Sequence, residues 1–173
     1  MTLVFATESQ GPVLTELPPL LICGWREWAG LPEMGVKRVK AKIDTGARSS
    51  ALHAFDLQTF DKDGREYVKF AVHPIQHNDQ AEVAVEIPIL ERRFIRSSNG
   101  IANERIVVRT QLRMLGQSFE IDLTLANRDA MGFRMLIGRE ALRERFLVDA
   151  SQSFLGGRVR HRRPRTPSTK HPS

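Results

Sequence analysis

Apolar and polar residues alternate along most of the chain, and this alternation is typical of β-strands that bury one face. It is most regular over 81–89, where Pro88 near the end indicates an edge strand or a strand terminus. Over 36–43 the residues between the apolar positions are basic, and we expect them to face water. The pattern predicts strands over residues 20–28, 36–43, 49–55, 66–72, 81–89, 92–96, 101–112, 118–125, 133–137 and 148–155.

Turn signals separate several of these predicted strands. Asp63-Gly64 and Asn99-Gly100 are two-residue hairpin signals, and Leu115-Gly116 marks a further turn. Asn99-Gly100 is the strongest of the three and predicts a long hairpin that joins 92–96 to 101–112.

One stretch has helical spacing instead. Within 139–146, Leu142 and Phe146 lie four residues apart and would share one face of a helix. This stretch follows the apolar strand 133–137, which leads into Gly138. Many short strands with a single late helix indicate an all-β fold, either a barrel or a sandwich.

Length and composition fit one domain. The chain has 173 residues, of which 41% are apolar and 27% charged, and we place the domain at 20–156, after a flexible leader over 1–19. The apolar runs are far shorter than the ~20 residues needed to span a bilayer, and the N-terminus lacks the pattern of a secretory signal. The single cysteine, Cys23, excludes an internal disulfide and favours a reducing cytoplasm.

The net charge of +6 comes from the end of the chain. Residues 157–173 hold six basic and no acidic residues, which leaves 20 residues of each sign in 1–156. Because this tail has almost no apolar residues, we expect it to be disordered. Its charge leaves two interpretations open: a solvated end, or an electrostatic tether to RNA, the ribosome or an acidic partner.

The segment 41–50 holds the strongest candidate for chemistry. An amphipathic strand ends there in Asp44, and Thr45 and Gly46 follow it. Gly46 permits a tight turn and a close approach to its backbone, and neighbouring N–H and hydroxyl groups could hold the Asp44 carboxylate in place. Taken alone, Asp-Thr-Gly is also ordinary turn chemistry, so the tripeptide leaves a purely structural turn open.

Longer motifs around this tripeptide resemble a known family. The segment 42–54, KIDTGARSSALHA, is similar to the catalytic signature of retropepsin-like aspartic peptidases, and Leu136-Ile137-Gly138-Arg139 is similar to their second signature. With 97–100 and 146–156 added, the chain resembles bacterial RimK-associated proteases, the so-called ATP-dependent zinc proteases. The resemblance covers about residues 21–156 and implies a retropepsin-like lobe: a closed β-barrel with one late α-helix and one active-site loop per chain.

The resemblance also implies an activity and a substrate. The family acts near the RimK ligase, which adds glutamates to a ribosomal protein, so a peptidase of this kind would trim oligo-glutamate tails. Aspartic peptidases hold one water between two carboxylates that share a proton. The chain has a single Asp-Thr-Gly and no Asp-Ser-Gly, so Asp44 would meet Asp44 of a second chain in a homodimer. Thr45 would lock the two loops together, Gly46 would admit substrate, and the predicted strand 148–155 would knit the dimer.

Further substrate contacts are expected beside the loop and in a basic hairpin. Ala47 and Arg48 follow the catalytic tripeptide, although the direction of Arg48 is left open. The hairpin 91–113 has four more basic than acidic residues and would cover the substrate as a flap. An alternative is that its arginines form a solvated strand face. As clamps for substrate carboxylates, the candidates are Arg93, Arg96 and Arg105.

A zinc site is the main alternative chemistry. Zinc needs three or four converging ligands, and the candidates are Asp44, His53, His73, His77 and Cys23. His73 and His77 would lie ~13 Å apart on an extended chain, too far for one ion. We therefore predict no cofactor, with Asp44 and His53 as the alternative zinc pair, and no phosphate-binding loop for ATP. A third hypothesis is a non-catalytic retropepsin-like module that docks on the ribosome or a ligase.

Overall fold

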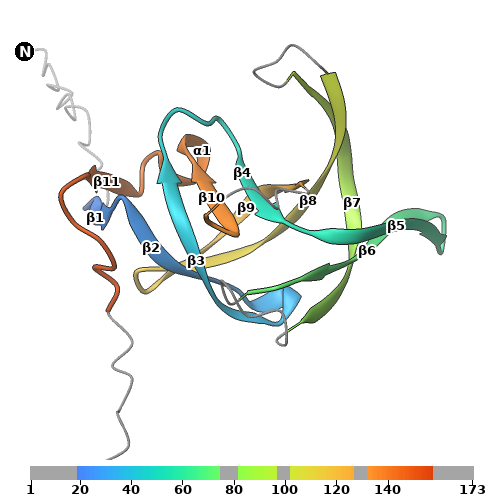
Figure 1. Ribbon diagram of the computed structural model, residues 1–173, viewed down its shortest axis with the longest axis horizontal. Coiled ribbons are helices and arrows are strands. Elements are labelled where there is room, and N and C mark those ends of the chain that lie inside the picture. Colours follow the sequence, from blue (N-terminus) through green and yellow to red (C-terminus); the bar gives the residue numbers. More distant parts are fainter. Residues whose placement is uncertain (1–18, 75–81, 97–101, 127–131, 158–173) are drawn as a thin grey trace, which may run out of the picture.

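The computed structural model describes residues 19–74, 82–96, 102–126 and 132–157. These residues form an all-β fold with eleven strands and two very short helices (Figure 1). The predicted leader and tail lie outside the described residues, except for residues 19 and 157. The elements are β1 (Leu21–Gly24), β2 (Arg26–Leu31), the 3-10 helix η1 (Pro32–Met34), β3 (Val36–Asp44), β4 (Ser50–His53), β5 (Phe55–Lys62), β6 (Arg65–Val72), β7 (Val83–Arg96), β8 (Ala102–Met114), β9 (Gln117–Ala126), β10 (Met135–Gly138), α1 (Arg139–Leu142) and β11 (Phe146–Asp149).

Six strands close into a barrel in the order β2, β3, β10, β4, β9 and β8, with β8 pairing back to β2. Closure depends on β8, because its 13 residues are long enough to pair with β7, β9 and β2. A closed sheet leaves no open barrel edge for another strand to pair with. The closed β-barrel expected from the sequence is thus confirmed.

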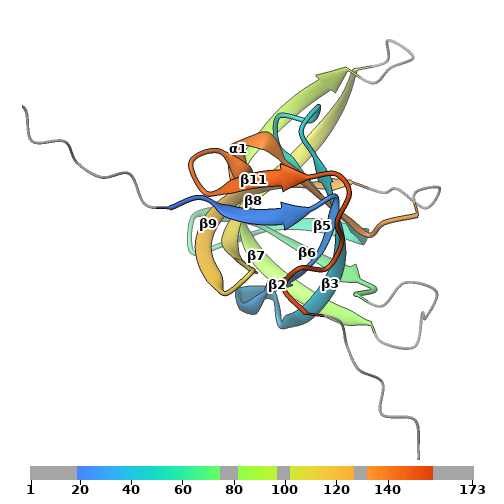
Figure 2. The ribbon, with the colours of Figure 1, turned by 90° about the vertical axis from the view of Figure 1, so that its left-hand side faces the viewer.

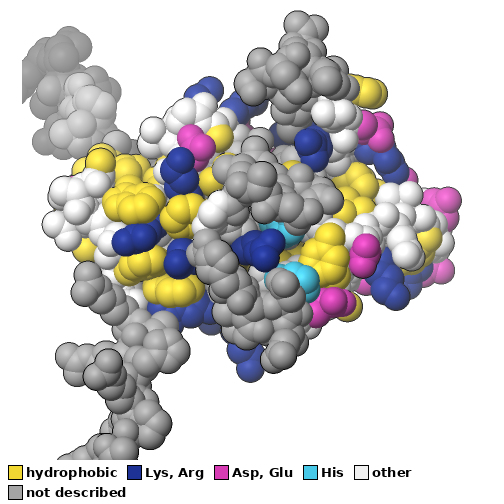
Figure 3. Space-filling model, in the orientation of Figure 1, with side chains coloured by type: hydrophobic (Ala, Val, Ile, Leu, Met, Phe, Trp, Pro, Cys, Tyr) yellow, Lys and Arg dark blue, Asp and Glu magenta, His cyan; other side chains and the backbone are white. Residues whose placement is uncertain are grey.

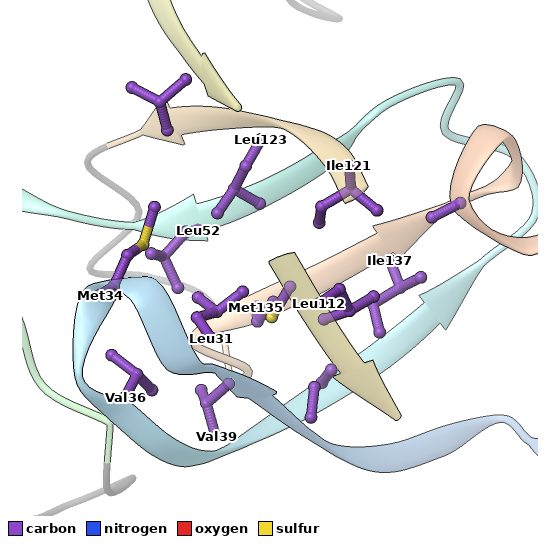
Figure 4. Packing of buried hydrophobic residues seen from close by; sticks show 14 of the residues in the cluster. Leu31, Met34, Val36, Val39, Leu52, Leu112, Ile121, Leu123, Met135 and Ile137 are labelled. Carbon is purple, nitrogen blue, oxygen red and sulfur yellow. The ribbon is translucent and has the colours of Figure 1, made fainter. Parts of the chain in front are cut away.

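The core fills the barrel with apolar side chains from its strands. Leu31, Leu52, Leu112, Met135 and Ile137 meet inside it, and each is at most 1% exposed (Figure 4). On β3 the apolar residues point inward and the basic residues between them point outward, as predicted. Burial of this apolar surface is the main driving force for folding.

A hairpin arm of β5 and β6 extends from the barrel and pairs with the first half of β7 (Figure 1). Its turn is Asp63-Gly64, as predicted, and both residues have positive φ. β7 continues through Pro88, so the alternative of a strand terminus there is wrong. Pro88 is the last residue paired with β6, and pairing with β8 begins at Ile89. The proline, which lacks an N–H, therefore occupies an edge position where β7 changes partner.

Two predicted strands are each broken in two. Residues 20–28 form β1 and β2, because at Trp25 the chain leaves the two-stranded sheet of β1 and β11 and enters the barrel. The Trp25 N–H donates to the carbonyl of Gln152 (3.0 Å) at this break. Residues 49–55 likewise divide at Ala54 between β4 in the barrel and β5 in the arm.

The helix and the last strand both end earlier than predicted. α1 stops at Leu142, because Arg143 has an extended ψ and Glu144 has a φ of 64°. Phe146 is therefore not on a helix but begins β11, which ends at Asp149 instead of reaching residue 155. Figure 2 shows β11 beside β1 of the same chain, and the two pair in parallel. Neither described helix has the length or apolar character required to cross a membrane.

The segment that follows β11 is attached to the barrel through a buried carboxylate. Glu27 on β2 is fully buried. Its Oε1 accepts hydrogen bonds from the N–H groups of Gly24 (2.8 Å) and Leu155 (2.9 Å), and its Oε2 accepts one from the N–H of Gly156 (3.3 Å). These three donors compensate for the loss of water around the carboxylate.

Candidate active site

Asp44 is the last residue of β3, and the barrel topology places it directly beside the second signature. β3 and β10 pair in parallel, with Ile43 opposite Ile137 and Asp44 opposite Gly138. The two motifs, which are more than ninety residues apart in the sequence, therefore lie side by side in the barrel. This juxtaposition agrees with the resemblance to retropepsin-like lobes.

The loop after β3 holds the Asp44 carboxylate with its own backbone. Oδ1 accepts hydrogen bonds from the N–H groups of Gly46 and Ala47, both at 3.1 Å. Within the described residues no hydrogen bond reaches Oδ2, so one oxygen is fixed and the other is available to a water or a substrate. Asp44 is half-buried, whereas Thr45 and Gly46 are exposed. The predicted catalytic tripeptide therefore faces outward with its carboxylate oriented.

The second signature clamps this loop from the other side. The N–H of Arg139 donates to the carbonyl of Ala47 (2.9 Å), and the N–H of Glu140 donates to the carbonyl of Arg48 (3.1 Å). The Arg139 guanidinium also donates to the carbonyl of Gly46 (3.2 Å). Leu136 and Ile137, the apolar pair of the signature, are buried beneath the loop. All four predicted residues of this signature thus support the Asp44 loop from below or beside it.

Gly138 is required at its position by close packing. A Cβ there would lie 2.5 Å from the carbonyl carbon and 2.6 Å from the carbonyl oxygen of Ser49, and 2.8 Å from the carbonyl oxygen of Arg48. The Gly138 N–H donates to the hydroxyl of Ser50 (3.2 Å), which holds the strand and the loop at this distance.

Gly138→Ala is therefore expected to lower the free energy of unfolding by about 3 kcal/mol, because backbone atoms must move to admit the methyl group. Chemical denaturation measures this loss. Gly156→Ala is the control, since its added Cβ would come close to the end of the flexible Leu115 side chain, at 3.2 Å, and would meet Oε2 of Glu27 and Cα of Leu115 at an ordinary contact distance of 3.8 Å. Equal stability of Gly138→Ala and wild type would contradict the close approach of loop and strand.

Arg48 is directed toward α1. Its Nε donates to Oε1 of Glu140 at 2.7 Å, and its side chain is 76% exposed. The hydrogen bond and charge of Arg48 hold the pKa of Glu140 below its usual value. The pair is exposed to water, so it contributes little to stability. The positive charge of Arg48 is thus engaged by Glu140 within the chain, beside the catalytic loop.

The arginines of the predicted flap are engaged in several ion pairs. Arg92 pairs with Glu66 and Glu104, and Arg109 pairs with Asp122. Arg93 contacts Glu91 and Asp122, and Arg105 lies opposite Arg93 in the β7–β8 register. The side chain of Arg96 and the turn at Asn99-Gly100 lie outside the described residues. Figures 1 and 2 both show this hairpin rising on the same side of the barrel as the loop after β3.

A groove of about 430 Å³ connects the Asp44 loop to β11, and Thr45, Arg48, Leu142 and Val148 are among its lining residues. Next to it lies an exposed apolar edge on β1 and β11, made of Leu20, Ile22, Leu147 and Val148. Ile22 and Leu147 are paired in register and are 56% and 55% exposed. The sequence prediction included Val148 in a strand that would knit a dimer, but it missed the other three residues of this edge, because alternation does not reveal which faces stay uncovered. It also gave no role to Glu140, whose partner Arg48 is distant in the sequence.

The zinc alternative is not supported by the position of His53. Asp44 lies opposite Gly138 on β10, whereas the His53 N–H donates to the carbonyl of Arg134 (2.7 Å). Arg134 directly precedes β10 and lies four residues before Gly138, a separation of ~13 Å along an extended chain. His53 is also only 3% exposed. Its ring and the Asp44 carboxylate therefore do not converge on one ion.

The other predicted ligands that the structure describes do not gather into a zinc site either. Burial, with the nearby charge of Glu27, raises the pKa of Cys23 to about 11, so its thiol remains protonated. Among the described residues no three His, Cys, Asp or Glu side chains converge as metal ligands do. His77 lies outside the described residues.

The chain is similar to parts of larger proteins. It is 45% identical over 136 residues to a probable alpha-L-glutamate ligase from Desulfotalea psychrophila, covering 78% of this chain and 29% of the relative. A probable alpha-L-glutamate ligase from Shewanella pealeana is 43% identical over 136 residues, which cover 79% of this chain and 30% of the relative. The chain thus spans about a third of the length of these relatives.

A solved structure and a family model agree on the fold. A crystal structure of a protein of unknown function from Legionella pneumophila superposes with a TM-score of 0.66 at 26% identity, covering 79% of this chain and 98% of that one. The model of the RimB-like family, described as the retropepsin-like aspartic endopeptidase RimB, matches residues 22–159. With the oriented Asp-Thr-Gly loop beside Gly138, these matches show that the chain belongs to the RimB-like family of retropepsin-like aspartic endopeptidases.

Proposed function

We propose that this chain is a homodimeric aspartic peptidase in which the Asp44 residues of two copies hold and activate one water. The observation that carries the proposal is the Asp44 carboxylate, fixed through Oδ1 by the amides of Gly46 and Ala47 in a loop clamped by β10 and α1. An unprotonated Asp44 takes a proton from the water, while the protonated Asp44 of the other copy donates to the scissile carbonyl. The water oxygen attacks the carbonyl carbon to form a tetrahedral diol. The first Asp44 then gives its proton to the amide nitrogen while the other Asp44 takes one from a hydroxyl of the diol. The C–N bond breaks, a carboxylic acid and an amine are released, and the pair again shares one proton.

The dimer is proposed because each chain supplies one catalytic carboxylate. Two such carboxylates around one water require two loops related by a two-fold axis. The exposed apolar edge on β1 and β11 adjoins the groove that Thr45 lines, so its burial would bring the Asp44 loops of two copies toward each other. Among the described strands β11 pairs only with β1, and its other side could pair with a strand of the second copy.

Leu147→Glu is expected to shift the protein from dimer to monomer, because a charge in the exposed apolar edge would lose its water on association. Sedimentation velocity measures the shift, and peptidase activity should fall with the dimer fraction. Leu57→Glu is the matched control, since Leu57 is an exposed leucine on the β5 arm. A monomeric Leu147→Glu protein that cleaves at the wild-type rate would contradict a dyad shared between chains.

The proposed substrate is an acidic peptide extension, namely the oligo-glutamate tail of a ribosomal protein in the cytoplasm. Two observations support it: the matched relatives are named probable alpha-L-glutamate ligase, and the hairpin beside the loop has an excess of basic residues. The direct test is hydrolysis of a peptide with a C-terminal oligo-glutamate extension. Wild-type protein should cleave it equally well with and without a chelator, since the proposed mechanism uses no metal.

A further inference from the structure

The outward face of β2 and β3 combines aromatic rings with cations. In register, Arg26 lies opposite Lys42 and Trp28 lies opposite Lys40, with Arg38 two residues before Lys40 on the same face. The single acidic residue of β2, Glu27, points inward and is fully buried. Figure 3 shows hydrophobic side chains interleaved with Lys and Arg in the region of β2 and β3. We call this surface the cation–aromatic face; its residues are Trp25, Arg26, Trp28, Arg38, Lys40, Lys42 and Phe154.

The rings and guanidinium groups of this face are stacked in one continuous layer. The Arg26 guanidinium lies 4.4 Å from the ring centre of Trp25 and 5.0 Å from that of Phe154. Phe154 stacks on Trp28 at 5.2 Å, and the Arg38 guanidinium lies 4.0 Å from the Trp28 ring. The Arg26 guanidinium contacts two rings, whereas that of Arg38 contacts Trp28 alone and so keeps a face for another planar group.

The cations of this face are not neutralised within the described part of the chain. Arg26, Arg38, Lys40 and Lys42 form no ion pair with another described residue, in contrast to the paired arginines of β7 and β8. The buried Nε atoms of Arg26 and Arg38 also have no hydrogen-bond partner. An uncompensated row of positive charge attracts a polyanion.

The geometry favours one kind of polyanion. Arg38, Lys40 and Lys42 occupy every second position of β3, so their side chains recur every ~7 Å. This spacing suits a polymer that carries one charge on each monomer. Next to them, a hollow of about 410 Å³ is lined by Trp28, Lys37, Arg38 and Arg113. Flat stacking surfaces beside a row of cations are the combination that binds unpaired bases and their phosphates. An acidic peptide would use the charges but not the planar surfaces.

We propose that the cation–aromatic face binds single-stranded nucleic acid, with Lys40 and Lys42 on the phosphates and the Arg38 guanidinium, supported by Trp28, against a base. Gly157 lies at the edge of this face, where its carbonyl accepts a hydrogen bond from Arg38 (3.2 Å). The six basic residues of 158–173 follow Gly157 in the sequence. The proposal does not depend on peptidase activity.

The test is fluorescence anisotropy of a labelled, unstructured RNA of about 12 nucleotides, with the full chain at several salt concentrations. The triple variant Arg38→Ala, Lys40→Ala, Lys42→Ala should bind at least about tenfold more weakly, and its salt dependence should fall by about two in slope. The control Lys62→Ala, Arg65→Ala, Lys69→Ala removes the same charge from the β5–β6 arm and should bind within about twofold of wild type.

A second variant separates stacking from charge. Trp28→Leu keeps an apolar side chain beneath Arg38 but removes the ring, so affinity should fall about fivefold or more with the salt slope unchanged. Equal weakening by the two triple variants would overturn the proposal, because it would mean binding by net charge alone. Absence of RNA binding by wild type would also overturn it, and so would displacement of the RNA by an equal concentration of oligo-glutamate peptide.

Discussion

Replacing Asp44 by asparagine is expected to lower hydrolysis of an oligo-glutamate peptide by about 10³-fold or more while leaving the fold intact. Asparagine keeps an oxygen that can accept the hydrogen bonds now donated by the Gly46 and Ala47 amides, so the loop should retain its shape. It cannot take a proton from water, and loss of a positioned acid or base costs about 10²–10⁴-fold in rate. Steady-state kinetics measures the loss, and thermal unfolding confirms that the variant remains folded.

Mixing the two proteins tests whether the two carboxylates come from different chains. If subunits exchange freely, wild-type protein equilibrated with an about tenfold excess of Asp44→Asn protein should retain about a tenth of its activity, because most wild-type chains then have an inactive partner. An excess of the Leu147→Glu variant should have a much smaller effect, since that chain is expected not to associate. Unchanged activity in the first mixture would reject a dyad shared between chains, whatever Asp44→Asn does on its own.

Glu27→Ala is expected to lower the free energy of unfolding by about 3 kcal/mol, the largest stability effect that we predict for a side chain away from the catalytic loop. The change leaves the buried N–H of Gly24 and the partly buried N–H groups of Leu155 and Gly156 without their acceptor. For a domain of this size, the loss corresponds to a decrease in Tm of roughly 6–12 °C.

Two substitutions make the Glu27 experiment specific. Glu27→Gln keeps an oxygen for Gly24 and Leu155 but turns an N–H₂ group toward the N–H of Gly156, so it should cost only about 1 kcal/mol. Glu33→Ala is the matched control, because Glu33 also accepts a hydrogen bond from a backbone amide, that of Gln111 (2.8 Å), but is exposed to water. Equal destabilisation by Glu27→Ala and Glu33→Ala would contradict a role for burial.

Much of the fold and the centre of the candidate site could be predicted from the sequence. Alternation on β3 correctly predicted which residues point inward, because burial of one face imposes a two-residue period. The turns at Asp63-Gly64 and Leu115-Gly116 were also correct, since positive φ at these positions is a local property. The Asp-Thr-Gly motif identified the loop whose carboxylate the structure finds held by its own amides.

The errors in helix and strand boundaries arose where the local sequence was compatible with more than one backbone conformation. Leu142 and Phe146 have helical spacing, yet only Leu142 is in the helix, because the backbone turns at Glu144 to bring Phe146 into register with Leu21 of β1. Trp25 fits a continuous strand in the sequence, but there the chain crosses from one sheet to another. Neither change has a strong local signal, because each is imposed by strands that are distant in sequence.

Local sequence patterns thus predicted most of the strands, the turns and the Asp-Thr-Gly motif, since these features depend on residues within a few positions of one another. Long-range packing added the parallel pairing of Asp44 with Gly138, the pairing of Arg48 with Glu140, and the separation of His53 from Asp44. It also left the cations of β2 and β3 without acidic partners among the described residues, while it paired Arg92, Arg93 and Arg109 of β7 and β8 with carboxylates. Such pairings join residues that are tens of positions apart, so they arise only when the barrel closes and brings those strands together.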